Sequence, residues 1–171
     1  GKRLNIPNSE IKEAFEIALS KQEEFFKKVK EMGIEALAEA RKSDRPVIAL
    51  LGRPYNAFTR EANMGIPKKF TSRNFSIIPF DALPFEGEDI FDNMYWYYGQ
   101  QDMKTAQLVK KEKNLYITFI TNFSCAPDSF MLHYLRWIQG TKPFLVLELD
   151  SHSADAGIDT RVEAFLDIIE G

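Results

Sequence analysis

The sequence predicts an α/β fold in which a four-stranded parallel sheet has helices on both faces and is preceded by a long N-terminal helix. Short continuous apolar runs, which are typical of buried strands, occur four times along the 171-residue chain. Between these runs, apolar residues recur at helical spacing. Strands that alternate with helical crossovers form parallel sheets, so these observations together favour this fold.

The first expected element is a helix over residues 9–42, in which Gly33 marks a place where the helix could break. Charged residues of both signs, typical of a solvated face, surround its apolar positions. We expect an N-terminal helical arm over 1–43, packed on the sheet or on a neighbour outside this chain, and an α/β domain over 44–171. The apolar residues of the arm fall close to one stripe: Ile11, Ala14, Phe15, Ala18, Phe25, Val29, Met32 and Leu37.

The remaining elements alternate along the chain. The predicted strands are PVIALL (46–51), FSIIPF (75–80), LYITFIT (115–121) and PFLVLEL (143–149). The predicted helices cover residues 60–73, 88–112, 128–139 and 157–170. Pro67 is expected in the first turn of its helix, where its missing N–H costs no hydrogen bond.

The loops after the strands hold most of the polar residues that could form a site. Parallel α/β sheets bind ligands outside the carboxyl ends of their strands, so these loops are expected to meet at one edge. The candidate pocket residues are Gly52, Arg53, Asn56, Asn122, Ser124, Asp128, His152 and Asp155.

Composition excludes several classes of protein. The net charge is −3, and residues 144–171 carry seven acidic side chains and one basic one, which argues against nucleic acid as a partner. No apolar run approaches the ~20 residues that a membrane span needs, so no membrane association is expected. The chain has no glycine-rich dinucleotide or phosphate-loop motif. It begins with Gly1 and ends within a helical pattern, so we expect a piece of a longer polypeptide.

The single cysteine, Cys125, lies where the third strand leads into a helix. One cysteine excludes an internal disulfide and makes the reducing cytoplasm the simplest compartment. A thiolate before a helix could act as a nucleophile with His152, or the residue could be a small buried thiol. One cysteine and two distant histidines lack the ligand number and spacing of a complete zinc or iron–sulfur site.

Four stretches resemble a known family. They are LLGRPYN, GIPKKF, NFSCAPDSFMLHYLR and KPFLVLELDSHSADAGIDTRVEAFLD, within about residues 36–170. They resemble the large activases related to 2-hydroxyacyl-CoA dehydratases, which are called CoA-substrate-specific enzyme activases. The resemblance implies a parent protein with an actin-like ATPase part and a part similar to a dehydratase subunit. It also implies flavodoxin-like (Rossmann-like) domains whose cysteines jointly hold an iron–sulfur cluster that receives an electron driven by ATP hydrolysis.

Carried over to this chain, the resemblance makes Cys125 one cluster ligand. The other ligands and the ATPase domain would lie outside the chain, so we expect no cluster in this chain alone and no ATP or thioester hydrolysis by it. Ser124 and Ala126 stand where the family has glycines, which bears on the fine geometry of the site. A homo-oligomer remains open. The alternatives are a structural or small-molecule-binding α/β domain with an incidental cysteine, and a cysteine hydrolase that uses Cys125 and His152.

Overall fold

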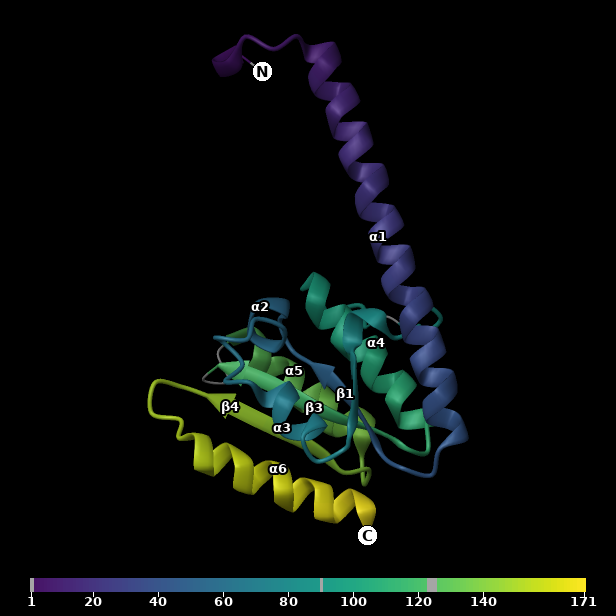
Figure 1. The fold of residues 1–171 in the computed structure, drawn as a ribbon, viewed down its shortest axis with the longest axis vertical. Coiled ribbons are helices and arrows are strands. Elements are labelled where there is room, and N and C mark those ends of the chain that lie inside the picture. The colour runs from purple at the N-terminus through teal and green to yellow at the C-terminus, as the bar shows by residue number, and fades with distance from the viewer. Residues whose placement is uncertain (1, 90, 123–125) are drawn as a thin grey trace.

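Residues 2–89, 91–122 and 126–171 of the chain are described in a computed structural model (Figure 1). Its four strands are β1 (Val47–Leu51), β2 (Ser76–Pro79), β3 (Leu115–Asn122) and β4 (Phe144–Leu149). All neighbouring strands pair in parallel in the order β2-β1-β3-β4. The predicted strands are therefore confirmed to within one residue at each end, and the strand order is that of a flavodoxin-like α/β fold.

Helices cover both faces of the sheet, as predicted. The helices are α1 (Asn8–Lys42), α2 (Pro54–Ala57), α3 (Ile66–Thr71), α4 (Tyr97–Lys111), α5 (Ala126–Gln139) and α6 (Asp155–Glu170). One apolar cluster joins the base of α1, α4 and α5 to one face, and a second joins α3 and α6 to the other. Every residue of β1 is buried, because its alternate side chains enter the two clusters.

Two helices begin later in the structure than the sequence predicts. The helix predicted from residue 88 begins at Tyr97, because the preceding chain turns to bury Met94, and the Gln100 side chain donates a hydrogen bond to the Met94 carbonyl (2.7 Å). The helix predicted from residue 60 begins at Ile66, because Met64 and Gly65 both have positive φ angles, which a right-handed helix cannot include. Pro67 lies in the first turn of α3, as expected.

The long helix α1 is continuous through Gly33, so the sequence interpretation of Gly33 as a break is wrong. A Cβ atom at this position would lie 1.9 Å from the carbonyl oxygen of Ala82, in the 3₁₀ turn after β2. Glycine is therefore required for close packing of α1 on that turn. Leu37 and Ala40, near the C-terminal end of α1, join the core. Residues 3–27, which include the N-terminal half of α1 and the residues before it, are exposed, and this half of the helix projects away from the sheet (Figure 1).

The division of the chain at residue 43 stays a prediction. Among the helices of the described ranges, none combines the length and the apolar composition that crossing a membrane requires.

Replacement of Gly33 by alanine should destabilise the protein. The new methyl group would overlap the Ala82 carbonyl, and overpacking of this kind costs roughly 1–3 kcal/mol. Gly157→Ala in α6 is the matched control, because a Cβ there meets no atom within 4 Å and should stabilise the helix by ~0.5 kcal/mol. Urea unfolding of the two variants measures both effects. Equal stabilisation by the two substitutions would contradict the packing role of Gly33.

Candidate functional site

A buried ion pair joins the loop after β1 to the start of α5. Arg53 Nη2 donates to Asp128 Oδ2 at 2.9 Å, and the Thr121 hydroxyl donates to the same carboxylate oxygen. The Arg53 side chain is 19 % exposed and the Asp128 side chain is fully buried. Loss of either member of such a pair leaves the other charge without compensation in the interior, so the two residues hold their elements together.

Gly52 brings the end of β1 against β3. Its φ is +133°, and a Cβ atom there would lie 2.4 Å from the carbonyl oxygen of Ile120. No other residue combines this backbone conformation with this close approach. Gly52 therefore places Arg53 directly beside the carboxyl end of β3.

Asp102, on α4, lies under this turn. The backbone N–H of Gly52 donates to Asp102 Oδ1 at 3.3 Å, and the Asp102 side chain is fully buried. Burial, with a contribution from the negative charge of Asp128, raises the Asp102 pKa to about 8. The carboxyl group is therefore largely protonated at neutral pH and can donate a hydrogen bond.

Asp102 was missed by the sequence analysis, although the sequence carries a signal for it. It is one residue from Met103 and lies a helical turn from Gly99 and Ala106, which share the buried face of α4. A carboxylate on the apolar stripe of a helix is a rare position for an acidic residue.

Two asparagines lie beside the ion pair and are connected to it by hydrogen bonds. Asn122, at the end of β3, donates from Nδ2 to Oδ1 of the buried Asn56 at 3.0 Å. The backbone N–H of Asn56 donates in turn to the Arg53 carbonyl at 2.8 Å. We refer to the connected set as the edge cluster: Gly52, Arg53, Asn56, Asp102, Thr121, Asn122 and Asp128.

Several buried atoms of the edge cluster have no hydrogen-bond partner among the described residues. They are Asn56 Nδ2, Asp102 Oδ2, Asn122 Oδ1 and Asp128 Oδ1. Buried polar atoms are nearly always paired in folded proteins, so these atoms are candidates for contact with a polar group or water.

The other predicted residues have different partners among the described residues or lie outside the described residues. Asp155 pairs with Lys69 of α3 at 2.6 Å, and Lys69 also pairs with Asp159 (2.8 Å), so these charges fasten α3 to α6. His152 is exposed, and its backbone N–H donates to Asp150 Oδ1 at 2.7 Å. Among the described residues, no hydrogen bond or ion pair joins His152 or Asp155 to the edge cluster. Ser124 and Cys125 lie outside the described residues.

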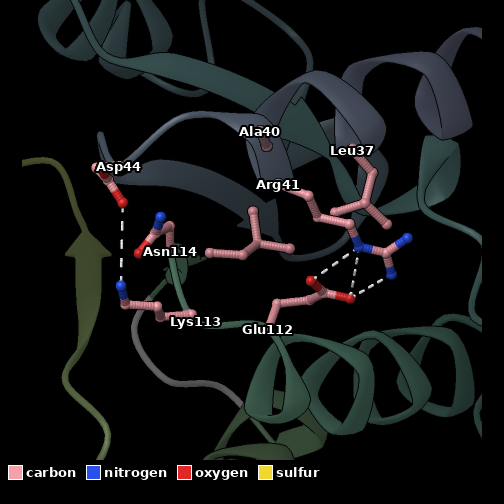
Figure 2. Close-up of a pocket in the computed structure, with 8 residues that line it drawn as sticks. Leu37, Ala40, Arg41, Asp44, Glu112, Lys113 and Asn114 are labelled. Carbon is pink, nitrogen blue, oxygen red and sulfur yellow. Dashed lines mark hydrogen bonds and ion pairs between the residues drawn. The ribbon is translucent and has the colours of Figure 1, made fainter.

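A different pocket, of about 180 Å³, lies at the amino ends of β1 and β3 (Figure 2). Its charged groups are paired with each other: Arg41 Nε lies 3.1 Å from Glu112 Oε2, and Lys113 lies 3.9 Å from Asp44. The Arg41–Glu112 pair joins the last turn of α1 to the α4–β3 connection and so helps to hold the long helix on the sheet, whereas the Lys113–Asp44 pair is exposed to solvent.

The edge cluster offers hydrogen-bond donors, acceptors and one protonated carboxyl group. Among the residues that the structure describes, no group of three or more His, Cys, Asp and Glu side chains could hold a metal ion. The chemistry of the described cluster is therefore that of positioning and polar recognition.

Replacement of Asp102 by asparagine should flatten the pH dependence of stability. The folded protein keeps the Asp102 proton up to a pH of about 8, whereas an unfolded carboxyl releases it near 3.8, so the free energy of unfolding should fall as pH rises through this window. The slope is on the order of 1 kcal/mol per pH unit, and the neutral amide of the variant removes it. Urea unfolding across this pH range, with the exposed Asp167→Asn as control, measures the effect. An unchanged slope in the Asp102 variant would contradict the raised pKa.

Comparison with known proteins gives one family. Residues 1–83 match the family model described as a CoA enzyme activase uncharacterised domain. This segment contains α1, β1, α2, α3 and β2, together with the loop that carries Gly52, Arg53 and Asn56. No curated protein and no solved structure matches the chain. The match covers just under half of the chain and is consistent with the resemblance to the CoA enzyme activases that the sequence indicates: residues 1–83 are similar to that domain.

Proposed function

We propose that this chain is a domain of an ATP-dependent iron–sulfur electron-transfer protein that activates or resembles 2-hydroxyacyl-CoA dehydratase. In this proposal Cys125 supplies one thiolate to a cluster whose other ligands come from outside the chain. An actin-like ATPase domain of the same parent polypeptide would supply the energy for electron transfer. The relation to the CoA enzyme activases supports the proposal.

One structural observation carries the role of Cys125. The residues on both sides of it are tied to the same loop: Asn122 is bonded to Asn56, and Asp128 is paired with Arg53. The chain therefore enters and leaves the segment around Cys125 through two fixed points at the carboxyl edge of the sheet. A site that holds a metal ligand requires support of this kind from its neighbouring residues.

The chain can supply one thiolate ligand to an iron–sulfur cluster but cannot hold a whole cluster by itself. A [4Fe–4S] centre is commonly held by about four thiolates, and the chain contains a single cysteine. The remaining thiolates must therefore come from other domains or from another subunit. When bound, such a cluster supplies one-electron chemistry; the residues of this chain position one of its ligands.

The charges around the segment suit a thiolate. Cys125 directly precedes Ala126, the first residue of α5, and the N-terminus of a helix favours a negative charge. The negative charge of Asp128 in the first turn is compensated by Arg53. The pair thus limits the repulsion that an unpaired carboxylate in the first turn of α5 would exert on a neighbouring thiolate.

A second candidate is a small-molecule-binding domain in which Cys125 is incidental. The unpartnered buried atoms of the edge cluster favour it, because a ligand with hydrogen-bond donors and acceptors would satisfy them. The third candidate, a cysteine hydrolase, would use Cys125, which lies outside the described residues, together with His152 in the exposed loop after β4.

The proposal is tested in the natural polypeptide that carries this chain, purified without oxygen. We expect it to contain iron and acid-labile sulfide, and we expect Cys125→Ser to lower both because one thiolate of the cluster is lost. Ser151→Ala, in the exposed loop after β4, is the control and should retain the iron of the parent. Full iron retention in the Cys125→Ser protein would remove the ligand assignment.

The 171-residue chain alone separates the first two candidates. If Cys125 is a ligand that lacks its companions, the chain should purify without iron, and a maleimide should label its thiol in the native state. Labelling only after denaturation would identify Cys125 as a buried thiol and favour the small-molecule-binding domain.

A further inference from the structure

The exposed half of α1 carries an apolar surface that the described structure leaves uncovered. It projects beyond the sheet (Figure 1), and Phe15, Phe25 and Phe26 are 65 %, 60 % and 52 % exposed. Large apolar side chains gathered on one side of a helix mark a contact surface. This surface belongs to the same face of α1 that enters the core through Leu37 and Ala40.

The apolar positions of this surface are arranged symmetrically along the helix. They alternate at spacings of four and three residues, which is the pattern of a helix–helix seam. The pattern is palindromic about Ser20, since each position has a counterpart at the same distance on the other side of it. We call this set the arm seam: Ile11, Phe15, Ala18, Gln22, Phe25 and Val29.

The symmetry of the arm seam points to its occupant. We propose that the arm seam pairs with the arm seam of a second copy of this chain, antiparallel, about a two-fold axis near Ser20. In this arrangement Phe15 lies opposite the partner's Phe25, and Ile11 lies opposite the partner's Val29. The same patch thus meets itself, as a two-fold symmetric interface requires.

Charge complementarity favours the antiparallel direction. Residues 10–16 carry a net charge of −2, and residues 24–30, which the two-fold axis at Ser20 places opposite them in the partner, carry a net charge of +2. Antiparallel arms place these segments opposite each other, whereas parallel arms would place like charges together. Gln22, opposite the partner's Ala18 in the central layer, would fix the register, as single polar residues do in coiled coils.

A groove continues the arm seam at the base of α1. It has a volume of about 540 Å³ and lies between Val29, Met32 and Ala36 of α1 and the edge strand β2. By the symmetry about Ser20, Asn8, the first residue of α1, lies opposite the partner's Met32, so the residues before it, which are not part of the helix, begin beside the partner's groove. Leu4 is 74 % exposed and Ile6 is 39 % exposed in the single chain, and both could enter the partner's groove. In the dimer, each copy therefore covers the arm seam and the groove of the other, and its exposed N-terminal residues are covered in turn.

The mass of the 171-residue chain in solution tests the proposal. Sedimentation equilibrium should give twice the monomer mass, and Phe15→Glu or Phe25→Glu should reduce it to that of the monomer, because each places two charges in the seam. Ile17→Glu is the matched control: Ile17 is 58 % exposed on the same helix but outside the arm seam, so that variant should stay dimeric. A monomeric parent chain, or a dimer that survives both phenylalanine changes, would overturn the proposal.

The direction of pairing is tested by spin labels on single cysteines in a Cys125→Ser background. Labels at Asn8 in the two copies should be separated along the axis by roughly 36 Å, since 24 residues of helix rise 1.5 Å each. Labels at Lys21, beside the axis, should lie much closer together. Equally short distances at both positions would mean parallel arms and would contradict the inference.

Discussion

The ion pair between Arg53 and Asp128 is the interaction on which the carboxyl edge of the sheet depends. It connects the loop after β1 to α5, and Thr121 of β3 bonds the same carboxylate. The burial of Asp128 makes the pair structural, because this carboxylate without Arg53 would be a charge without compensation in the interior. The close approach of Gly52 to β3 makes the pair possible, and the pair fixes one end of the segment that contains Cys125.

The base of α1 is held by two contacts. Arg41 pairs with Glu112 near the amino ends of β1 and β3 (Figure 2), and Gly33 packs on Ala82 in the turn that follows the carboxyl end of β2, so the base keeps one orientation. Since α1 is continuous, a fixed base also fixes the direction of its exposed half. The fold therefore presents a polar site at one edge and a long helical surface beyond the other elements. Both features suit a domain that works together with further polypeptide.

Much of the fold could be predicted from local patterns. Four continuous apolar runs identified the parallel strands, because strands covered on both faces need no polar alternation. Positions that depend on distant contacts could not be predicted. Gly33 resembles a helix break in the sequence. The structure shows that glycine is needed there because α1 packs against the carbonyl group of Ala82, a contact that the sequence does not reveal. The position of Asp102 on the apolar stripe of its helix signals that the residue is buried, but its partner, the backbone N–H of Gly52, is 50 residues away in the sequence and could not be predicted.

A double-mutant cycle on Arg53 and Asp128 tests the central interaction most directly. The free energy of unfolding would be measured in urea for the parent chain, Arg53→Met, Asp128→Leu and the double variant. Loss of Arg53 should cost roughly 3–5 kcal/mol, because it leaves the fully buried Asp128 carboxylate without its counter-charge, and loss of Asp128 should cost less, because Arg53 is 19 % exposed and also donates to Tyr55. The double variant should cost clearly less than the sum of the two, as expected for residues in direct contact. Additive costs would show that the two side chains are not coupled and would contradict this account of the edge.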